Sequence, residues 1–171
     1  MLRGASKRLV IDASVAKAAG WSAHPSSSAS RHFLRAVLDI CHQMVLTPPL
    51  TEEWHRHQSK FTREWRKSMH ARKKITQLEA EQNAGLRTRL LDPGAGENPL
   101  AIRLKDVPLL EAALRADHIV VSLDEEARNA FQFRELNIIT WLNPVRERER
   151  VNAWLEDGAP AVEEWKLGRE V

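Results

Sequence analysis

The stretch RLVIDASVA, residues 8–16, runs through three large apolar residues to an acid, Asp12, which is followed by small side chains. Leu9, Val10 and Ile11 are typical of a short strand that is buried on both faces. A carboxylate at the end of such a strand is costly to bury and therefore needs a specific reason.

Strand and helix patterns alternate along the chain after this stretch. We predict further strands at MVLTPP (44–49), HIVVS (118–122) and NIITW (137–141). Predicted helices cover 31–43, 50 to about 91 with a break near 83–85, 106–116 and 124–136, and DPGAGENP (92–99) is a predicted loop. Strands that alternate with helices imply a parallel sheet covered on both faces. The predicted fold class is therefore α/β, with three layers in the order α/β/α.

Length and composition limit the class of protein. A chain of 171 residues is long enough for one domain with a sizeable core. Its longest apolar runs fall far below the roughly 18 residues of a membrane span. The single cysteine, Cys41, has no partner for an internal disulfide and lies in an apolar stretch, so we expect it to be buried. These features predict a cytoplasmic protein that does not enter membranes.

Positive charge is concentrated in one segment. Residues 55–78 contain eight Lys or Arg and one acid, whereas the whole chain carries a net charge of only +3. Such a basic face attracts polyanions, and we predict a nucleic-acid-binding role for Arg63, Arg66, Lys67, Lys73 and Lys74. The alternative is a solvated helix face. Trp54 and Trp65 lie in or beside this segment and are interpreted either as packing residues or as base-stacking platforms.

Acidic residues come from four separate segments that the parallel sheet would bring to one edge. Asp12 ends the first strand, Asp124 follows the HIVVS strand, Glu52 and Glu53 follow the MVLTPP strand, and Asp106 opens a predicted helix. Carboxylates brought so close repel unless some are protonated or a cation lies between them. Oxygen-only ligands favour Mg²⁺ or Mn²⁺.

Each acid also has a purely structural interpretation. Asp106 and Asp124 precede helices and would serve as N-caps, and Ser122 with Glu125 matches a capping box. Glu52 and Glu53 would be solvated residues of a first helical turn, and Asp12 would form an Asx-turn. Glu53 and His57 would share a helix face and either pair or bind a metal together. A zinc site is disfavoured because no cysteine and no second suitably spaced histidine accompany them.

Three segments together resemble the acidic motifs of the PIN-domain ribonucleases, the family that includes VapC-type toxins. They are LVIDASVA (9–16), LTPPLTEEW (46–54) and KDVPLLEAALRADHIVVSLDEEARNAF (105–131). The resemblance covers residues 8–54 and 104–142 but neither 61–102 nor the tail after Pro144. It implies a PIN-like domain over 1–143 with a longer helical and loop segment at about 55–103, followed by a C-terminal helical extension over 144–171.

The resemblance also implies the roles of individual residues. Asp12 resembles the first metal-binding acid, Glu53 the second with Glu52 as the alternative, Asp106 the third and Asp124 the fourth. Ser122 resembles the small hydroxyl residue that orients the acids. The implied activity is Mg²⁺- or Mn²⁺-dependent hydrolysis of RNA by an endoribonuclease, with single-stranded RNA as substrate. Further implied partners are a second copy of the chain and, in a toxin role, an antitoxin protein. The alternative function is a catalytically silent PIN-like module that binds nucleic acid or protein.

Overall fold

A central parallel sheet organises the chain. The computed structural model describes residues 6–92 and 100–169, and in that part of the chain five strands form one sheet in the order β3-β2-β1-β4-β5. The strands are β1 (Arg8–Ile11), β2 (Gln43–Leu46), β3 (Ile75–Gln77), β4 (Ile119–Val121) and β5 (Thr140–Leu142). All neighbouring pairs are parallel, with Val10 opposite both Val45 and Val120. The inner strands are buried on both faces, which explains their unbroken apolar runs.

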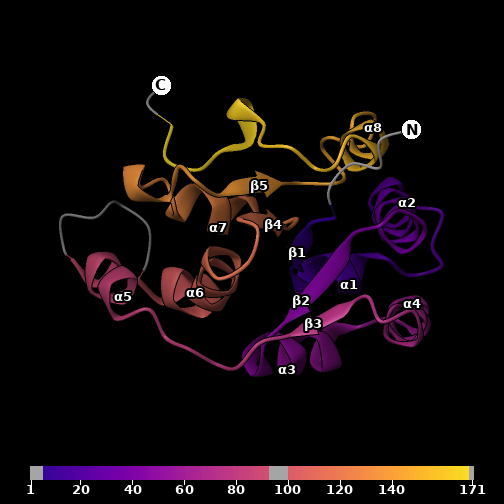
Figure 1. Cartoon of the computed structure of the whole chain (residues 1–171), viewed down its shortest axis with the longest axis horizontal. Helices are drawn as coiled ribbons and strands as arrows, with labels where there is room; N and C mark the ends of the chain where they lie inside the picture. Colours follow the sequence, from indigo (N-terminus) through magenta and orange to yellow (C-terminus); the bar gives the residue numbers. More distant parts are fainter. Residues whose placement is uncertain (1–5, 93–99, 170–171) are drawn as a thin grey trace.

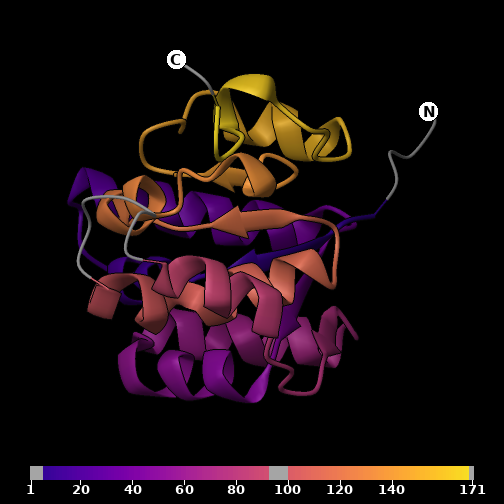
Figure 2. The ribbon, with the colours of Figure 1, turned by 90° about the vertical axis from the view of Figure 1, so that its left-hand side faces the viewer.

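Helices cover both faces of the sheet. They are α1 (Ala13–Ala18), α2 (Pro25–Asp39), α3 (Pro48–His57), α4 (Lys60–Ala71), α5 (Ala84–Leu91), α6 (Leu100–Leu114), α7 (Glu125–Ala130) and α8 (Val151–Glu156). Figure 1 shows α2 and α4 on one side of the sheet and α5 and α6 on the other, and Figure 2 shows α5 and α6 in front of it. The predicted α/β fold class and its three-layer arrangement are confirmed.

The C-terminal segment, after Pro144, packs on the β5 edge of the sheet. In Figures 1 and 2 this yellow segment lies over β5. Thr140 forms an isolated antiparallel bridge with Lys166, and the backbone N–H of Leu167 donates to the carbonyl of Ile139 at 3.0 Å. Trp154 and Trp165 belong to the same apolar cluster as the sheet residues. The segment therefore shares the core of the preceding residues.

The prediction of a long helix from residue 50 to about 91 is wrong. The chain instead forms α3, α4, the strand β3 and α5. Ser59 begins α4 as an N-cap, because its Oγ accepts a hydrogen bond from the Thr62 backbone N–H at 3.1 Å. Lys73, with a φ of 56°, lies between α4 and β3, where the chain turns toward the edge of the sheet.

Other predicted boundaries also differ. The helix predicted to begin at residue 31 begins at Pro25, a residue suited to a first helical turn, and ends at Asp39. The helix predicted to begin at residue 106 begins at Leu100, so Pro108 lies inside α6 rather than in its first turn. The helix predicted for 124–136 ends at Ala130, and a short 3₁₀ helix follows at Arg134–Leu136. Except for Asp92, the predicted loop at 92–99 lies outside the described residues.

The expected burial of Cys41 is wrong. Cys41 is exposed rather than buried, because it lies in the turn between α2 and β2 instead of on an apolar helix face. Within residues 6–92 and 100–169, none of the helices combines the length and the apolar character needed to cross a membrane.

Candidate metal centre

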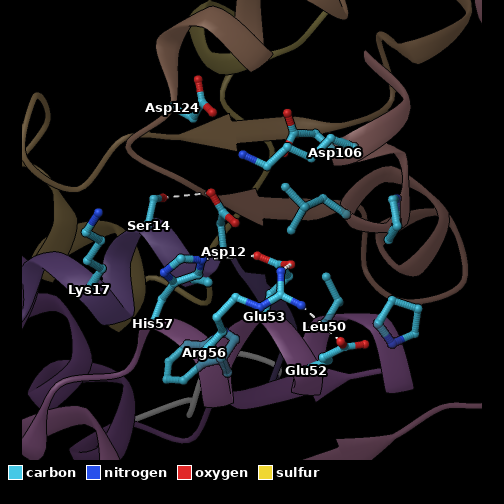
Figure 3. A pocket seen from close by; sticks show the side chains of 16 residues that line it. Asp12, Ser14, Lys17, Leu50, Glu52, Glu53, Arg56, His57, Asp106 and Asp124 are labelled. Atoms are coloured by element: carbon cyan, nitrogen blue, oxygen red, sulfur yellow. Dashed lines mark hydrogen bonds and ion pairs between the residues drawn. The ribbon is translucent and has the colours of Figure 1, made fainter. Parts of the chain in front are cut away.

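Five acids from four elements line one pocket of about 310 Å³, because Glu52 lies beside Glu53 on the same helix. Asp12 joins β1 to α1, Glu53 lies on α3, Asp106 on α6, and Asp124 precedes α7. Figure 3 shows these side chains around the pocket together with Lys17, Arg56 and His57. The strand order explains the convergence, because β1 and β4 are neighbours whose carboxyl ends open at one edge of the sheet. We call this site the acidic pocket.

Two serine hydroxyls hold the Asp12 carboxylate. Ser14 Oγ donates to Asp12 Oδ2 at 2.7 Å, and Ser122 Oγ donates to the same oxygen at 2.8 Å. Ser122 also accepts a hydrogen bond from the backbone N–H of Asp124 at 3.0 Å and is fully buried. Ser122 therefore links Asp12 on one strand end to Asp124 on the next. Ser14 was not singled out from the sequence, although a hydroxyl two residues after an aspartate is a common local partner.

Asp124 caps α7. Its Oδ1 accepts a hydrogen bond from the Ala127 backbone N–H at 2.9 Å, so the capping interpretation is confirmed for this residue. The predicted Ser122–Glu125 capping box is wrong, because Ser122 contacts Asp12 and Glu125 accepts from Asn143 Nδ2 instead. No hydrogen bond to Asp124 Oδ2 is present among the described residues, so the cap uses one carboxylate oxygen.

Glu52 and Glu53 lie in the middle of α3. The interpretation that placed them in a first helical turn is therefore wrong. Arg56 pairs with both carboxylates at 3.0 Å, and His57 Nε2 lies 3.5 Å from Glu53 Oε2. The Glu52 side chain is 72% exposed and that of Glu53 is 38% exposed. Glu53 also acts electrostatically on Asp106. Of the two glutamates, Glu53 is therefore the less exposed one and the one close enough to act on Asp106.

Asp106 is the buried member of the group. It is 7% exposed, and its Oδ2 is buried without a hydrogen-bond partner among the described residues. Burial, together with the negative charges of Asp12, Asp124 and Glu53, raises the pKa of Asp106 to about 7. The interpretation of Asp106 as an N-cap is wrong, because the residue lies inside α6 and has no helix end to cap. A structural role of that kind therefore does not explain this carboxylate.

The donor set of the acidic pocket fits a hard divalent cation in its chemistry. Its acids offer oxygen atoms only, and the partnerless Asp106 Oδ2 is a buried acceptor that a cation would satisfy. Among the described residues, however, no three His, Cys, Asp or Glu side chains are grouped closely enough to hold a metal ion. Glu53 is turned to Arg56 and His57, so metal binding would require this side chain to leave them.

None of the five predicted nucleic-acid-binding residues lines the acidic pocket. The basic side chains that do are Lys17, Arg56, His57 and Lys105. Lys74 donates from Nζ to the carbonyls of Val37, Leu38 and Ile40, so it closes the end of α2. A more local signal was available in the sequence, since Arg56, Lys105 and Lys17 stand three, one and five residues from a site acid.

The remaining predicted basic residues lie elsewhere on the molecule. Arg66 and Lys67 line a second pocket, and Lys67 Nζ lies 3.7 Å from Glu64. Arg63 and Lys73 are exposed.

Trp54 and Trp65 are packing residues. Both are buried, their rings stack with centroids 5.8 Å apart, and their Nε1 atoms donate to the carbonyls of Ile11 and Leu34. The base-stacking interpretation is wrong for both, because neither ring face is open to a ligand. The exposed tryptophan is Trp21, with 65% of its surface accessible.

No protein-family model and no curated protein matches this chain.

Proposed function

We propose that this protein is a divalent-metal-dependent endoribonuclease of the PIN type, which hydrolyses phosphodiester bonds of single-stranded RNA. The observation that carries the proposal is the convergence of Asp12, Glu53, Asp106 and Asp124 from four elements on one pocket. A binding module gains nothing from clustered negative charge that faces phosphates. A hydrolase that uses Mg²⁺ or Mn²⁺ needs such a cluster.

In this proposal the four acids hold the cation and the hydroxyl groups of Ser14 and Ser122 keep Asp12 oriented. When bound, Mg²⁺ or Mn²⁺ supplies an activated water and stabilises charge on the phosphoryl oxygens. Lys17 and Lys105 line the same pocket, are exposed, and offset the charge of the substrate backbone. Arg56 pairs with both Glu52 and Glu53 and so reduces the repulsion between these carboxylates, a role that a cation held by Glu53 would take over.

The biological setting is part of the proposal. The partners it implies are RNA, a second copy of the chain and, if the enzyme is a toxin, an antitoxin protein. The proposed location is the cytoplasm.

One observation favours a second candidate, a catalytically silent nucleic-acid-binding or protein-interaction module. Glu53 is already paired with Arg56 and lies close to His57, and the described acids are not grouped as metal ligands. In a silent module those pairings persist and the protein does not bind Mn²⁺. Thermal unfolding with and without Mn²⁺ separates the two candidates, because a ligand that binds only the folded state raises its stability.

The test is cleavage of a mixed-sequence single-stranded RNA by the wild type and by Asp12→Asn, each with Mn²⁺, Mg²⁺ or EDTA. We expect cleavage by the wild type that EDTA abolishes. Asp12→Asn should lower the rate by about 10²–10³-fold, the loss typical of one preorganised electrostatic contact. Asparagine keeps the shape of the side chain and an oxygen that accepts from Ser14 and Ser122, so the fold should persist.

The matched control is Asp39→Asn, which removes an exposed carboxylate outside the pocket. This variant should cleave like the wild type and show the same rise in melting temperature with Mn²⁺. Full activity of Asp12→Asn, or cleavage that continues in EDTA, would refute the proposed function. An unfolded Asp12→Asn protein would instead mark Asp12 as a structural residue.

A further inference from the structure

A second pocket, of about 430 Å³, lies where α3 and α4 meet β2 and β3. Four basic side chains line it, and its apolar lining includes Leu46 and Ile75. No Asp or Glu of the described residues contributes to its lining. We call it the basic pocket, and its basic residues are His55, Arg66, Lys67 and His70.

Arg66 is the unusual member of this pocket. Its Nη1 is buried and, within residues 6–92 and 100–169, has neither a hydrogen-bond partner nor an acid in an ion pair with its guanidinium. Burial, and then the positive charge of Arg63, lower the pKa of Arg66. A buried guanidinium donor without an acceptor is unfavourable, whereas the same donor directed at an anionic oxygen forms a strong, charge-assisted hydrogen bond. The group is therefore suited to an anion that comes from outside the chain.

The surroundings of Arg66 favour a nucleotide over a simple ion. Lys67 is exposed and would add positive charge around a phosphate, and the exposed His55 and His70 carry ring N–H groups that would donate to its oxygens. Leu46 and the half-buried Ile75 would contact the apolar part of a ribose or a base.

The two pockets lie on different faces of α3. Thr51 and His55, one helical turn apart, line the basic pocket, whereas Glu53, Arg56 and His57 line the acidic pocket. A helix with its side chains is about 10–12 Å across. An extended strand that crosses α3 would therefore contact both pockets within a few nucleotides.

We propose that the basic pocket binds a backbone phosphate of the RNA strand, with Arg66 as the phosphate-binding side chain. This inference rests on the proposed function for the identity of the ligand, because the acidic pocket is where that strand would be cleaved. The phosphate contact positions the strand and carries no sequence information.

The experiment measures binding without cleavage. Fluorescence anisotropy of a labelled oligouridine is followed in EDTA, at several salt concentrations, for the wild type, Arg66→Gln and Arg169→Gln. Arg169 is exposed in the C-terminal segment and lines neither pocket, so the second variant removes the same charge far from the proposed phosphate site. Arg66→Gln should weaken binding about tenfold, as expected for a lost hydrogen bond to a charged group. It should also reduce the slope of log K against log salt by about one. Arg169→Gln should change both values little.

Three results would overturn the proposal: unchanged affinity of Arg66→Gln, an equal loss in Arg169→Gln, or binding of poly-L-glutamate but not of oligouridine through Arg66. Circular dichroism reports whether Arg66→Gln is folded. If it is not, Lys67→Gln changes an exposed member of the pocket and should still lower the affinity and the salt slope.

Failure of this proposal and failure of the proposed function are distinguishable. A wild type that cleaves RNA while Arg66→Gln binds RNA normally contradicts only the phosphate site. A wild type that binds through Arg66 but never cleaves contradicts only the nuclease activity.

Discussion

The acidic and basic pockets differ in how their charges are supported. Asp12 accepts hydrogen bonds from two hydroxyls, and Asp124 from the backbone of α7, so these carboxylates are fixed by the fold. In the basic pocket, by contrast, no described residue accepts a hydrogen bond from the buried Nη1 of Arg66, and the other basic side chains are exposed. The fold holds the carboxylates of the acidic pocket in place, whereas the basic pocket leaves Arg66 free to pair with an anion from outside the chain.

The two pockets also share a property. Asp106 Oδ2 in one and Arg66 Nη1 in the other are buried polar atoms without partners among the described residues. They do not satisfy each other, because α3 separates the pockets. Asp106 and Arg66 could have paired with each other, but the fold holds them apart. Each therefore needs its own explanation, which favours two ligand sites over a structural ion pair.

After Asp12→Asn, the largest effect on RNA cleavage is expected at Ser122, which contacts Asp12 and Asp124 of the acidic pocket and lines no part of the basic pocket. Ser122→Ala removes one of two donors to Asp12 and the acceptor for the Asp124 backbone N–H. We expect RNA cleavage to fall about 10- to 100-fold, as for loss of other groups that orient metal ligands. More Mn²⁺ should be needed for half-maximal activity.

Ser122→Thr retains the hydroxyl group and should cleave RNA nearly as fast as the wild type. A role of Ser122 in packing alone would not explain such a difference between the threonine and alanine variants. Binding of RNA in EDTA should be unchanged in Ser122→Ala. Wild-type cleavage by the alanine variant would show that Ser14 alone orients Asp12.

A smaller effect, on stability and not on binding, is expected at Lys74. Lys74→Met leaves the carbonyls of Val37, Leu38 and Ile40 without this donor and should cost about 1–3 kcal/mol of the free energy of unfolding. Lys73→Met is the matched control, because it removes the same charge from the neighbouring exposed residue. Denaturant unfolding measures both. If Lys74→Met were as stable as the wild type but bound RNA more weakly, Lys74 would be a nucleic-acid-binding residue, as the sequence predicted.

The smallest effect is a pH-dependent change in melting temperature at Asp106. Because its pKa is raised from 3.8 to about 7 in the folded protein, the folded state holds a proton that the unfolded state has lost between these values. Ionisation therefore lowers stability as pH rises toward 7, and the loss is complete above it. Solvent screening reduces this loss. Asp106→Asn in EDTA should raise the melting temperature by about 2–4 °C at pH 8 and by less at pH 5.

Thermal unfolding at both pH values, with Asp39→Asn as the control, checks this expectation. An equal shift at pH 5 and pH 8 would mean that the Asp106 carboxylate is not destabilised by burial and neighbouring charge.

The sheet was predictable where strands are apolar and buried. Leu9, Val10 and Ile11, and likewise Ile119, Val120 and Val121, are buried as their unbroken apolar runs indicate. β3 was not predictable in this way, because Ile75–Gln77 is a half-polar run at the edge of the sheet. Its strand conformation comes from pairing with β2, a contact between residues far apart in sequence.

The acids of the site were predictable because strand ends in a parallel sheet meet at one edge, so Asp12 and Asp124 were placed by topology alone. The partners of the basic residues were not. A charge count treats Arg66 and Lys74 as equivalent, yet the Arg66 Nη1 has no acceptor among the described residues, whereas Lys74 Nζ donates to three carbonyls. That difference depends on which helix end or pocket lies opposite each side chain.

By itself, the sequence determined the α/β alternation and the acids that follow the buried strands, since both are expressed in short runs of neighbouring residues. The tertiary structure decided that Trp54 and Trp65 pack in the core and that Arg56, rather than Lys73 or Lys74, lies beside the acids. It also placed two pockets of opposite charge on two faces of α3. The physical reason is that burial and charge pairing depend on distances between elements, which local patterns of residues do not contain.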